Sequence, residues 1–286
     1  MGKIVIVGSG PAGCSAALYA ARAGQEVVVI SMGMGALSKA ELIQNYYGFG
    51  EGITGAELYR QGVAGAKAVG AEFITAEVVG LDYTGSLVVQ TTEGDYPADA
   101  VILATGAGRI APKIAGLAEH EGRGVSYCAT CDAFFYRGKT AAVLGSGEYA
   151  LHEVQALLPL AGKVILCTNG EPLTADFPEG VEICTEKLAA VEGEEKVSAL
   201  RLENGELLPV EGLFVALGVA GSAALARKLG APVENGRIVV DERMQTGIPG
   251  LYAAGDCTGG LLQVCKAVYE GALAATEAIK QIRGKK

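Results

Sequence analysis

The feature that most constrains the fold is a glycine-rich turn between an apolar run and a helix-like segment. Its first copy is Gly8-Ser9-Gly10-Pro11-Ala12-Gly13. This turn follows the apolar run 4–7, precedes a helix predicted over 14–23, and leads to a second apolar run at 25–30. In that context the glycines let a pyrophosphate approach the backbone at a helix N-terminus. The pattern predicts a dinucleotide-binding strand–helix–strand unit.

The same pattern recurs in the second half of the chain, as Gly145-Ser146-Gly147-Glu148-Tyr149-Ala150. Predicted strands at 140–144 and 163–167 flank a helix predicted over 151–160, and each copy is closed by an apolar run that ends in glycine, 100–106 and 212–218. Continuous apolar runs are typical of parallel strands covered on both faces. We therefore predict an α/β fold with two Rossmann-like domains, each doubly wound and three-layered.

Charge and hydropathy exclude several functional classes. The 286 residues have a formal net charge of −9, which argues against nonspecific binding of nucleic acid. No apolar run is long enough to cross a bilayer. The first predicted strand begins at Lys3 and leaves no room for a signal peptide, so a cytoplasmic protein is expected.

The run Cys128-Ala129-Thr130-Cys131-Asp132 predicts dithiol chemistry. Two thiols at this spacing can close a readily reduced disulfide: one attacks a substrate disulfide and the other resolves the mixed intermediate. A zinc site is not expected, because a second close cysteine pair is missing and the only histidines are His120 and His152. The remaining cysteines are interpreted as small buried residues: Cys14, Cys167, Cys184, Cys257 and Cys265.

Taken together, these motifs resemble the low-molecular-weight thioredoxin reductases over essentially the whole chain. The matching runs are the first glycine turn, Asn45-Tyr46-Tyr47-Gly48, Ala104-Thr105-Gly106-Ala107, the dithiol run continued to Tyr136, and Ala253-Ala254-Gly255-Asp256. The resemblance implies a homodimer whose first domain binds FAD and is split in sequence. The second domain is inserted into the first and bears the dithiol and an NADPH site. The substrate implied is thioredoxin.

Roles follow from the resemblance residue by residue. Gly8, Gly10 and Gly13 would hold the FAD pyrophosphate, Asn45 and Gln263 would lie near the flavin, and Asp256 would bind the ribityl chain. Cys131 would take electrons from the flavin, Cys128 would attack the partner disulfide, and Asp132 would act as acid and base. The full set of expected cofactor contacts is Gly8, Ser9, Gly10, Pro11, Ala12, Gly13, Ser31, Asn45, Thr105, Gly106, Asp256 and Gln263.

The expected domain boundaries follow the same resemblance. Residues 1–110 and 244–286 would form the FAD-binding domain, and residues 113–241 the dithiol-bearing domain. Hinges are expected at 106–112 and around 243–247.

In the first unit, Ser31 and Met32 stand where the generic dinucleotide fingerprint places an acid, which argues against NAD at the first site. Departures from the family concentrate in the second nucleotide site. In the second unit no Lys or Arg occurs from Val164 to Glu186, although a 2′-phosphate needs basic partners. Glu148, in the first turn of the second helix, would repel a phosphate. Near the C-terminus, Leu262 replaces an arginine of the family and Tyr269 a small residue, which could shield the flavin.

These departures are similar to a branch of the family that takes electrons from reduced ferredoxin. FAD suits such a donor because it accepts single electrons in sequence and passes on a pair. Two groups of basic residues are candidates for docking ferredoxin: Arg109, Lys113, Arg123, Arg137 and Lys139, and Lys280, Arg283, Lys285 and Lys286. Two alternatives stay open. One is an NADH- or NADPH-dependent reductase with a nonstandard nucleotide site, and the other is a flavin-bound redox sensor without turnover.

Overall fold

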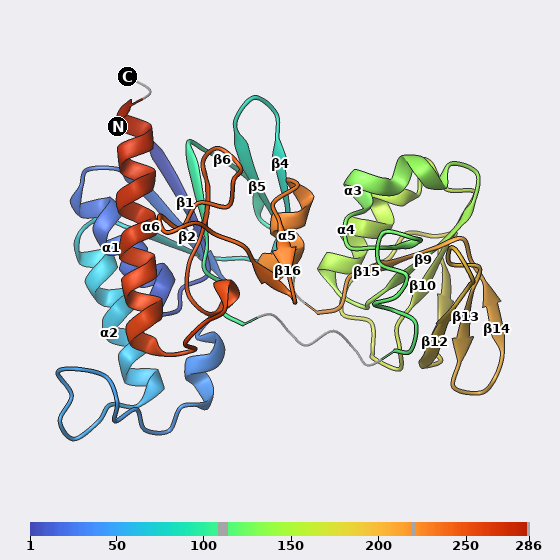
Figure 1. Ribbon diagram of the computed structural model, residues 1–286, viewed down its shortest axis with the longest axis horizontal. Coiled ribbons are helices and arrows are strands. Elements are labelled where there is room, and N and C mark those ends of the chain that lie inside the picture. Colours follow the sequence, from blue (N-terminus) through green and yellow to red (C-terminus); the bar gives the residue numbers. More distant parts are fainter. Residues whose placement is uncertain (108–113, 219–220, 285–286) are drawn as a thin grey trace. The chain divides into compact units, whose positions relative to one another are not determined.

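A computed structural model describes residues 1–107, 114–218 and 221–284. The chain divides into two compact units (Figure 1). Unit 1 comprises Met1–Arg109 and Gly221–Lys286, and unit 2 comprises Ile110–Ala220.

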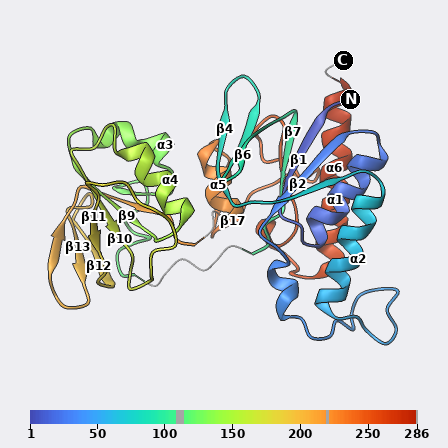
Figure 2. The same ribbon diagram turned by 180° about the vertical axis from the view of Figure 1, so that it is seen from behind.

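Unit 1 is built on a parallel five-stranded sheet with the order β18-β7-β1-β2-β3. Its strands are β1 (Lys3–Val7), β2 (Glu26–Ser31), β3 (Glu72–Thr75), β7 (Ala100–Leu103) and β18 (Leu251–Ala253). One face is covered by the helices α1 (Pro11–Arg22), α2 (Gly55–Ala68) and α6 (Val264–Gly284). The other face carries a small antiparallel sheet of β4 (Val78–Tyr83), β5 (Leu87–Thr91) and β6 (Gly94–Ala98) (Figure 2). This is the predicted three-layer arrangement.

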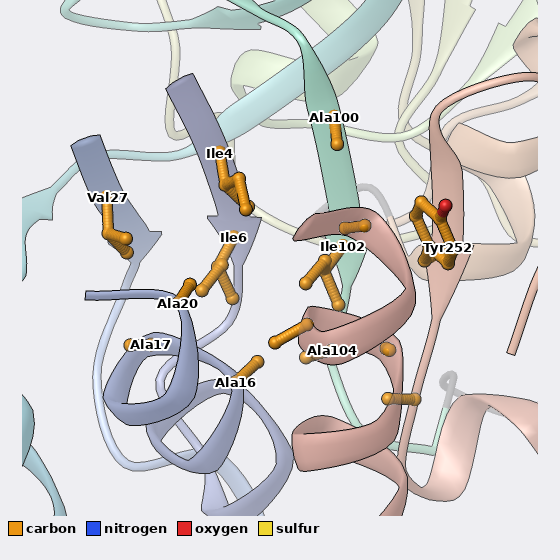
Figure 3. Close-up of a cluster of buried hydrophobic side chains, with 14 of the residues drawn as sticks. Ile4, Ile6, Ala16, Ala17, Ala20, Val27, Ala100, Ile102, Ala104 and Tyr252 are labelled. Carbon is orange, nitrogen blue, oxygen red and sulfur yellow. The ribbon is translucent and has the colours of Figure 1, made fainter. Parts of the chain in front are cut away.

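The core of unit 1 explains why its strands are apolar throughout. Ile4, Ile6 and Ile102 are fully buried between the sheet and the helices (Figure 3). The facing side of α1 presents alanines such as Ala16 and Ala20, which let the helix lie close to the strands. Burial at this level stabilises each isoleucine side chain by roughly 1.5–3 kcal/mol.

Unit 2 repeats the plan, as the duplicated pattern predicted. Its parallel sheet has the order β11-β10-β9-β15-β8. The strands are β8 (Val125–Ser126), β9 (Thr140–Leu144), β10 (Lys163–Cys167), β11 (Glu182–Cys184) and β15 (Gly212–Val215). An antiparallel sheet adds β12 (Leu188–Glu192), β13 (Ala199–Leu202) and β14 (Leu207–Pro209). The helices are α3 (Ala129–Asp132), η2 (Ala133–Tyr136) and α4 (Glu148–Leu157).

The return of the chain to unit 1 comes earlier than the sequence suggested. Contacts place residues from Gly221 onward with unit 1, whereas the expected junction lay between 241 and 244. The reason is that α5 (Ser222–Lys228) packs on β4 and buries Leu225 completely. The hinge expected at 106–112 lies largely outside the described residues.

Several short helices and strands complete unit 1. They are η1 (Gly35–Lys39), β16 (Val233–Glu234), β17 (Arg237–Ile238) and η3 (Asp256–Thr258). Among the helices described in both units, none is long and apolar enough to span a bilayer.

Candidate active site

The first glycine turn presents bare backbone at the start of α1. The N-cap residue is Gly10, no side chain caps the helix, and its first turn contains no acid. A Cβ added at Gly10 would meet nothing within 4 Å, so this glycine faces open space. A Cβ at Gly13 would lie 1.8 Å from the carbonyl oxygen of Gly8, so Gly13 serves the close packing of the turn. The unsatisfied N–H groups of α1 therefore fit a pyrophosphate.

The space above this turn is part of a pocket of about 330 Å³ in unit 1. Of the expected cofactor contacts, those that line it are Gly8, Ser9, Gly10, Pro11, Ala12, Asn45, Thr105, Gly106, Asp256 and Gln263. Asn45 Nδ2 donates to Gln263 Oε1 at 2.7 Å, although the two residues are far apart in sequence. Ten of the twelve expected contacts thus line one pocket. Its bare backbone cradle, amide pair and carboxylate fit the phosphates, ring edge and hydroxyls of FAD.

Two expected contacts lie elsewhere. Gly13 and Ser31 are not among the residues that line the pocket. Ser31 Oγ instead donates to Ser9 Oγ at 2.7 Å, and Ser9 is buried. Ser31 therefore hydrogen-bonds to the glycine turn, and it does so at the position where the fingerprint has an acid. Of the two departures near the C-terminus, Leu262 lines the pocket, whereas Tyr269 does not and is 64% exposed.

An ion pair that the sequence did not reveal holds the loop that presents Asp256. Lys266 Nζ lies 3.0 Å from Glu270 Oε2, and both side chains are largely buried. Lys266 donates to the carbonyl oxygen of Gly255 at 2.8 Å, and Glu270 accepts from its N–H at 2.8 Å. Gly255 has a φ of 88°, which disfavours residues with a Cβ. The pair thus satisfies both backbone groups of a residue in an unusual conformation.

Asp256 lies in a partly desolvated place. Burial raises the pKa of its carboxyl group above the ordinary value, Lys266 opposes that shift, and Glu270 adds to it. At neutral pH the carboxylate can accept hydrogen bonds from cofactor hydroxyls, which would also relieve its desolvation.

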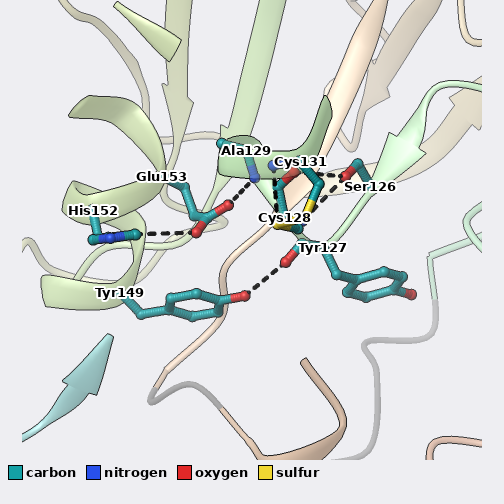
Figure 4. Close-up of polar contacts among 8 residues, drawn as sticks. All are labelled: Ser126, Tyr127, Cys128, Ala129, Cys131, Tyr149, His152 and Glu153. Atoms are coloured by element: carbon teal, nitrogen blue, oxygen red, sulfur yellow. Dashed lines mark hydrogen bonds and ion pairs between the residues drawn. A yellow bond between two sulfur atoms is a disulfide. The ribbon is translucent and has the colours of Figure 1, made fainter. Parts of the chain in front are cut away.

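The dithiol lies in unit 2 and is oxidised. Cys128 and Cys131 form a disulfide, with Cα atoms 5.3 Å apart. Cys128 is the N-cap of α3, and its Sγ accepts from the N–H of Cys131 at 3.1 Å (Figure 4). Cys128 is only 4% exposed, whereas Cys131 is exposed. A group of three or more potential metal ligands occurs nowhere in the described part of the chain.

Ser126, which the sequence did not single out, organises the acid beside the dithiol. Its Oγ donates to Asp132 Oδ2 at 2.7 Å and accepts from the N–H of Cys128 at 3.1 Å. The carboxylate of Asp132 is thereby fixed near the backbone of Cys128. Asp132 is thus linked to the dithiol turn through Ser126.

An exposed aromatic pair follows the dithiol directly. Phe134 and Phe135 are 64% and 67% exposed and meet edge to face. The Arg137 guanidinium lies 5.1 Å from the centre of the Phe134 ring. Large exposed aromatic residues are characteristic of protein-binding surfaces.

The second glycine turn differs from the first in what covers it. A Cβ at Gly147 would lie 3.0 Å from Thr174 Oγ1, and the N–H of Thr174 donates to the Ser146 carbonyl at 2.8 Å. Glu148 stands in the first turn of α4. A group added on Gly147 would therefore meet Thr174, and a phosphate at this turn would face the Glu148 carboxylate.

One basic side chain does reach the end of β10. A Cβ built on Gly170 would lie 3.2 Å from Lys187 Cε, although Lys187 lies outside the acidic stretch that follows β10 in sequence. The sequence pattern did not indicate Lys187, because this residue precedes β12 and comes to lie beside the end of β10 only in the folded chain.

The other cysteines are mostly buried, as interpreted. Burial raises the pKa of the Cys14 thiol to about 12 and that of Cys257 to about 11, and it raises the pKa of Cys167 as well. Cys184 is only partly buried, and Cys265 is exposed, contrary to expectation, because it lies on the outer side of the first turn of α6.

The basic candidates for docking ferredoxin are only partly described. Arg109, Lys113, Lys285 and Lys286 lie outside the described residues. Lys280 pairs with Glu277 at 2.6 Å, and Arg283 donates to the Ala23 carbonyl. Arg123 donates to the Glu119 carbonyl, and Lys139 lies over the Tyr136 ring.

Comparison with known proteins identifies the family that shares this arrangement. Residues 2–271 match the family model described as pyridine nucleotide-disulphide oxidoreductase. A thioredoxin reductase of Aquifex aeolicus (strain VF5) is 36% identical, over 99% of this chain and 94% of that protein. The atypical thioredoxin reductase TRi from Desulfovibrio vulgaris Hildenborough has a TM-score of 0.93 at 40% identity, covering 99% of each chain.

A ferredoxin-flavin thioredoxin reductase from Clostridium acetobutylicum has a TM-score of 0.76 at 35% identity, covering 99% of this chain and 98% of that one. The match to the family model and to these relatives extends over both units. The chain belongs to the pyridine nucleotide-disulphide oxidoreductase family and is an FAD-binding disulfide reductase of the thioredoxin reductase type.

Proposed function

We propose that this protein reduces thioredoxin with electrons from reduced ferredoxin, through FAD in unit 1 and the Cys128–Cys131 dithiol in unit 2. The observation that supports this donor is the contrast between the two glycine turns. The first is open at Gly10, whereas Thr174 covers the second at Gly147. A reductase that lacks a working pyridine nucleotide site needs another reductant. Bound FAD would supply the ability to take electrons singly and release them as a pair.

The dithiol chemistry follows from the local hydrogen bonds. The N–H of Cys131 points at Cys128 Sγ, the sulfur to which we assign the attack. After reduction of the dithiol, Cys128 attacks as the thiolate, forms a mixed disulfide with thioredoxin and displaces one thioredoxin thiolate. Cys131 then attacks Cys128 Sγ, releases the second thioredoxin thiolate and restores the disulfide. Two electrons and two protons pass from the dithiol to thioredoxin, with Asp132 as the proton carrier.

Because Cys128 is 4% exposed in the oxidised protein, its attack requires that this sulfur become more accessible. Phe134 and Phe135 offer an apolar surface for the protein substrate beside the dithiol. We also propose that the protein forms a homodimer, as the family resemblance implies.

Dependence on NADH or NADPH is the second candidate. Lys187 beside Gly170 supports the NADPH form of this candidate, because it places a cation at the strand end where a 2′-phosphate is recognised in this fold.

Turnover distinguishes an enzyme from a redox sensor. With excess oxidised thioredoxin and excess reduced ferredoxin under anaerobic conditions, we expect thioredoxin thiols to form at many equivalents per protein molecule. Thiol labelling followed by mass spectrometry would count them. A single equivalent per molecule, followed by no further reaction, would identify a sensor that switches without turnover.

A further inference from the structure

Helix α4 starts from a covered glycine turn, yet one of its faces is buried against the dithiol. Tyr149 and Glu153 are four residues apart and therefore lie one above the other on the helix. Tyr149 is 2% exposed and Glu153 is fully buried. Burying a carboxylate costs free energy unless hydrogen bonds or an opposite charge compensate for the lost water. The partners of Glu153 therefore indicate what this face of the helix does.

The two side chains bind the backbone on either side of Cys128 (Figure 4). Tyr149 Oη donates to the carbonyl oxygen of Tyr127 at 3.0 Å. Glu153 Oε2 accepts from the N–H of Ala129. The peptide groups immediately before and after Cys128 are thus both attached to the same helix.

The other contacts of this cluster complete the positioning. Ser126 Oγ accepts from the N–H of Cys128 itself at 3.1 Å. His152 Nδ1 lies 3.3 Å from the second carboxylate oxygen, Glu153 Oε1, and fixes its orientation. Three consecutive positions of the chain, 127 to 129, are therefore held by side chains, and the direction of Cys128 Sγ follows from theirs.

We propose that Tyr149 and Glu153 form a positioning clamp that aims Cys128 Sγ for thiol–disulfide interchange. The inference rests on the proposed function and adds two residues to it. In this inference the role of α4 is to orient the dithiol turn. Interchange needs the attacking sulfur in line with the S–S bond under attack, so small displacements lower its rate.

The test is a single-turnover measurement on FAD-loaded protein. The dithiol is reduced anaerobically with dithiothreitol, desalted, and mixed in a stopped-flow instrument with oxidised thioredoxin or with a nitrobenzoate disulfide. For Tyr149→Phe we expect the rate constant at saturating thioredoxin to fall about five- to tenfold, and for Glu153→Leu about ten- to a hundredfold. Half-saturation by thioredoxin should not change. Glu153→Gln retains an acceptor for Ala129 and should stay within about threefold of the wild type.

The matched control is Gln155→Ala, which alters an exposed residue of the same helix and should leave the rates unchanged. Wild-type rates in both Tyr149→Phe and Glu153→Leu would overturn the clamp. So would a Glu153→Gln variant as slow as Glu153→Leu, because charge and not positioning would then be the cause. If the wild type reacts with the small disulfide but not with thioredoxin, the proposed function fails, and the small disulfide still tests the clamp.

Discussion

Replacing either Cys128 or Cys131 by serine is expected to abolish thioredoxin reduction, with a loss in rate of at least about 10³-fold. A hydroxyl can neither form a mixed disulfide nor resolve one, so no electron pair can leave through the dithiol. Reduction of the flavin by its donor should be unaffected, because the pocket in unit 1 contains neither residue. Steady-state thioredoxin reduction and flavin absorbance measured on the same samples would separate the two steps.

The same pair of variants assigns the attacking thiol. If Cys128 attacks, Cys131→Ser should accumulate a mixed disulfide with thioredoxin, whereas Cys128→Ser should not. Non-reducing electrophoresis reports this complex directly. The control is Cys265→Ser, which removes an exposed thiol outside the site and should retain full turnover. A complex that forms only with Cys128→Ser would reverse the roles and make the exposed Cys131 the nucleophile.

Substituting aspartate for Gly10 should remove FAD while leaving unit 1 folded. Gly10 has a φ of −69°, which any residue adopts, and its added Cβ would meet nothing. An aspartate there would occupy the N–H groups of α1 and repel a pyrophosphate. Losing two charged hydrogen bonds at about 1.5–3 kcal/mol each predicts an affinity for FAD lower by about 10²- to 10⁴-fold. Titration of apoprotein with FAD, followed by flavin fluorescence, measures this.

Gly147→Asp is the matched control, because it makes the same change at the second turn. We expect unchanged affinity for FAD and unchanged turnover with ferredoxin, since Thr174 already covers that turn. Circular dichroism should show native folding in both variants. Normal binding of FAD by a folded Gly10→Asp protein would contradict the assignment of the pocket.

Local patterns were sufficient to predict the scaffold. The strands over 140–144 and 163–167 appear where expected, because each is an apolar run bounded by polar or glycine residues and buried on both faces. The glycine turns also appear at the predicted places, since their spacing reflects steric requirements within a few residues. The convergence of Asn45 and Gln263 could be expected only from the family resemblance.

Features that depend on contacts between distant segments could not be predicted. Thr174 covers Gly147 only because the chain after β10 folds back over the turn. The early return to unit 1 likewise involves distant segments: α5 packs on β4, and the N–H of Ser222 donates to Thr105 Oγ1 at 2.9 Å across a separation of 117 residues. Lys266 and Glu270 lie at helical spacing, but their shared contact with Gly255 appears only once α6 is packed. No periodicity or motif in the sequence encodes such contacts.

The most direct test of the electron donor is an anaerobic titration of the oxidised, FAD-loaded protein. Reduced ferredoxin, NADPH and NADH are each added at micromolar concentration while the visible absorption of the flavin is followed in time. The account predicts rapid bleaching by reduced ferredoxin and none by either pyridine nucleotide on the same timescale. Rapid bleaching by NADPH or NADH would contradict it, and would show that a nucleotide displaces Thr174 or binds elsewhere in the protein.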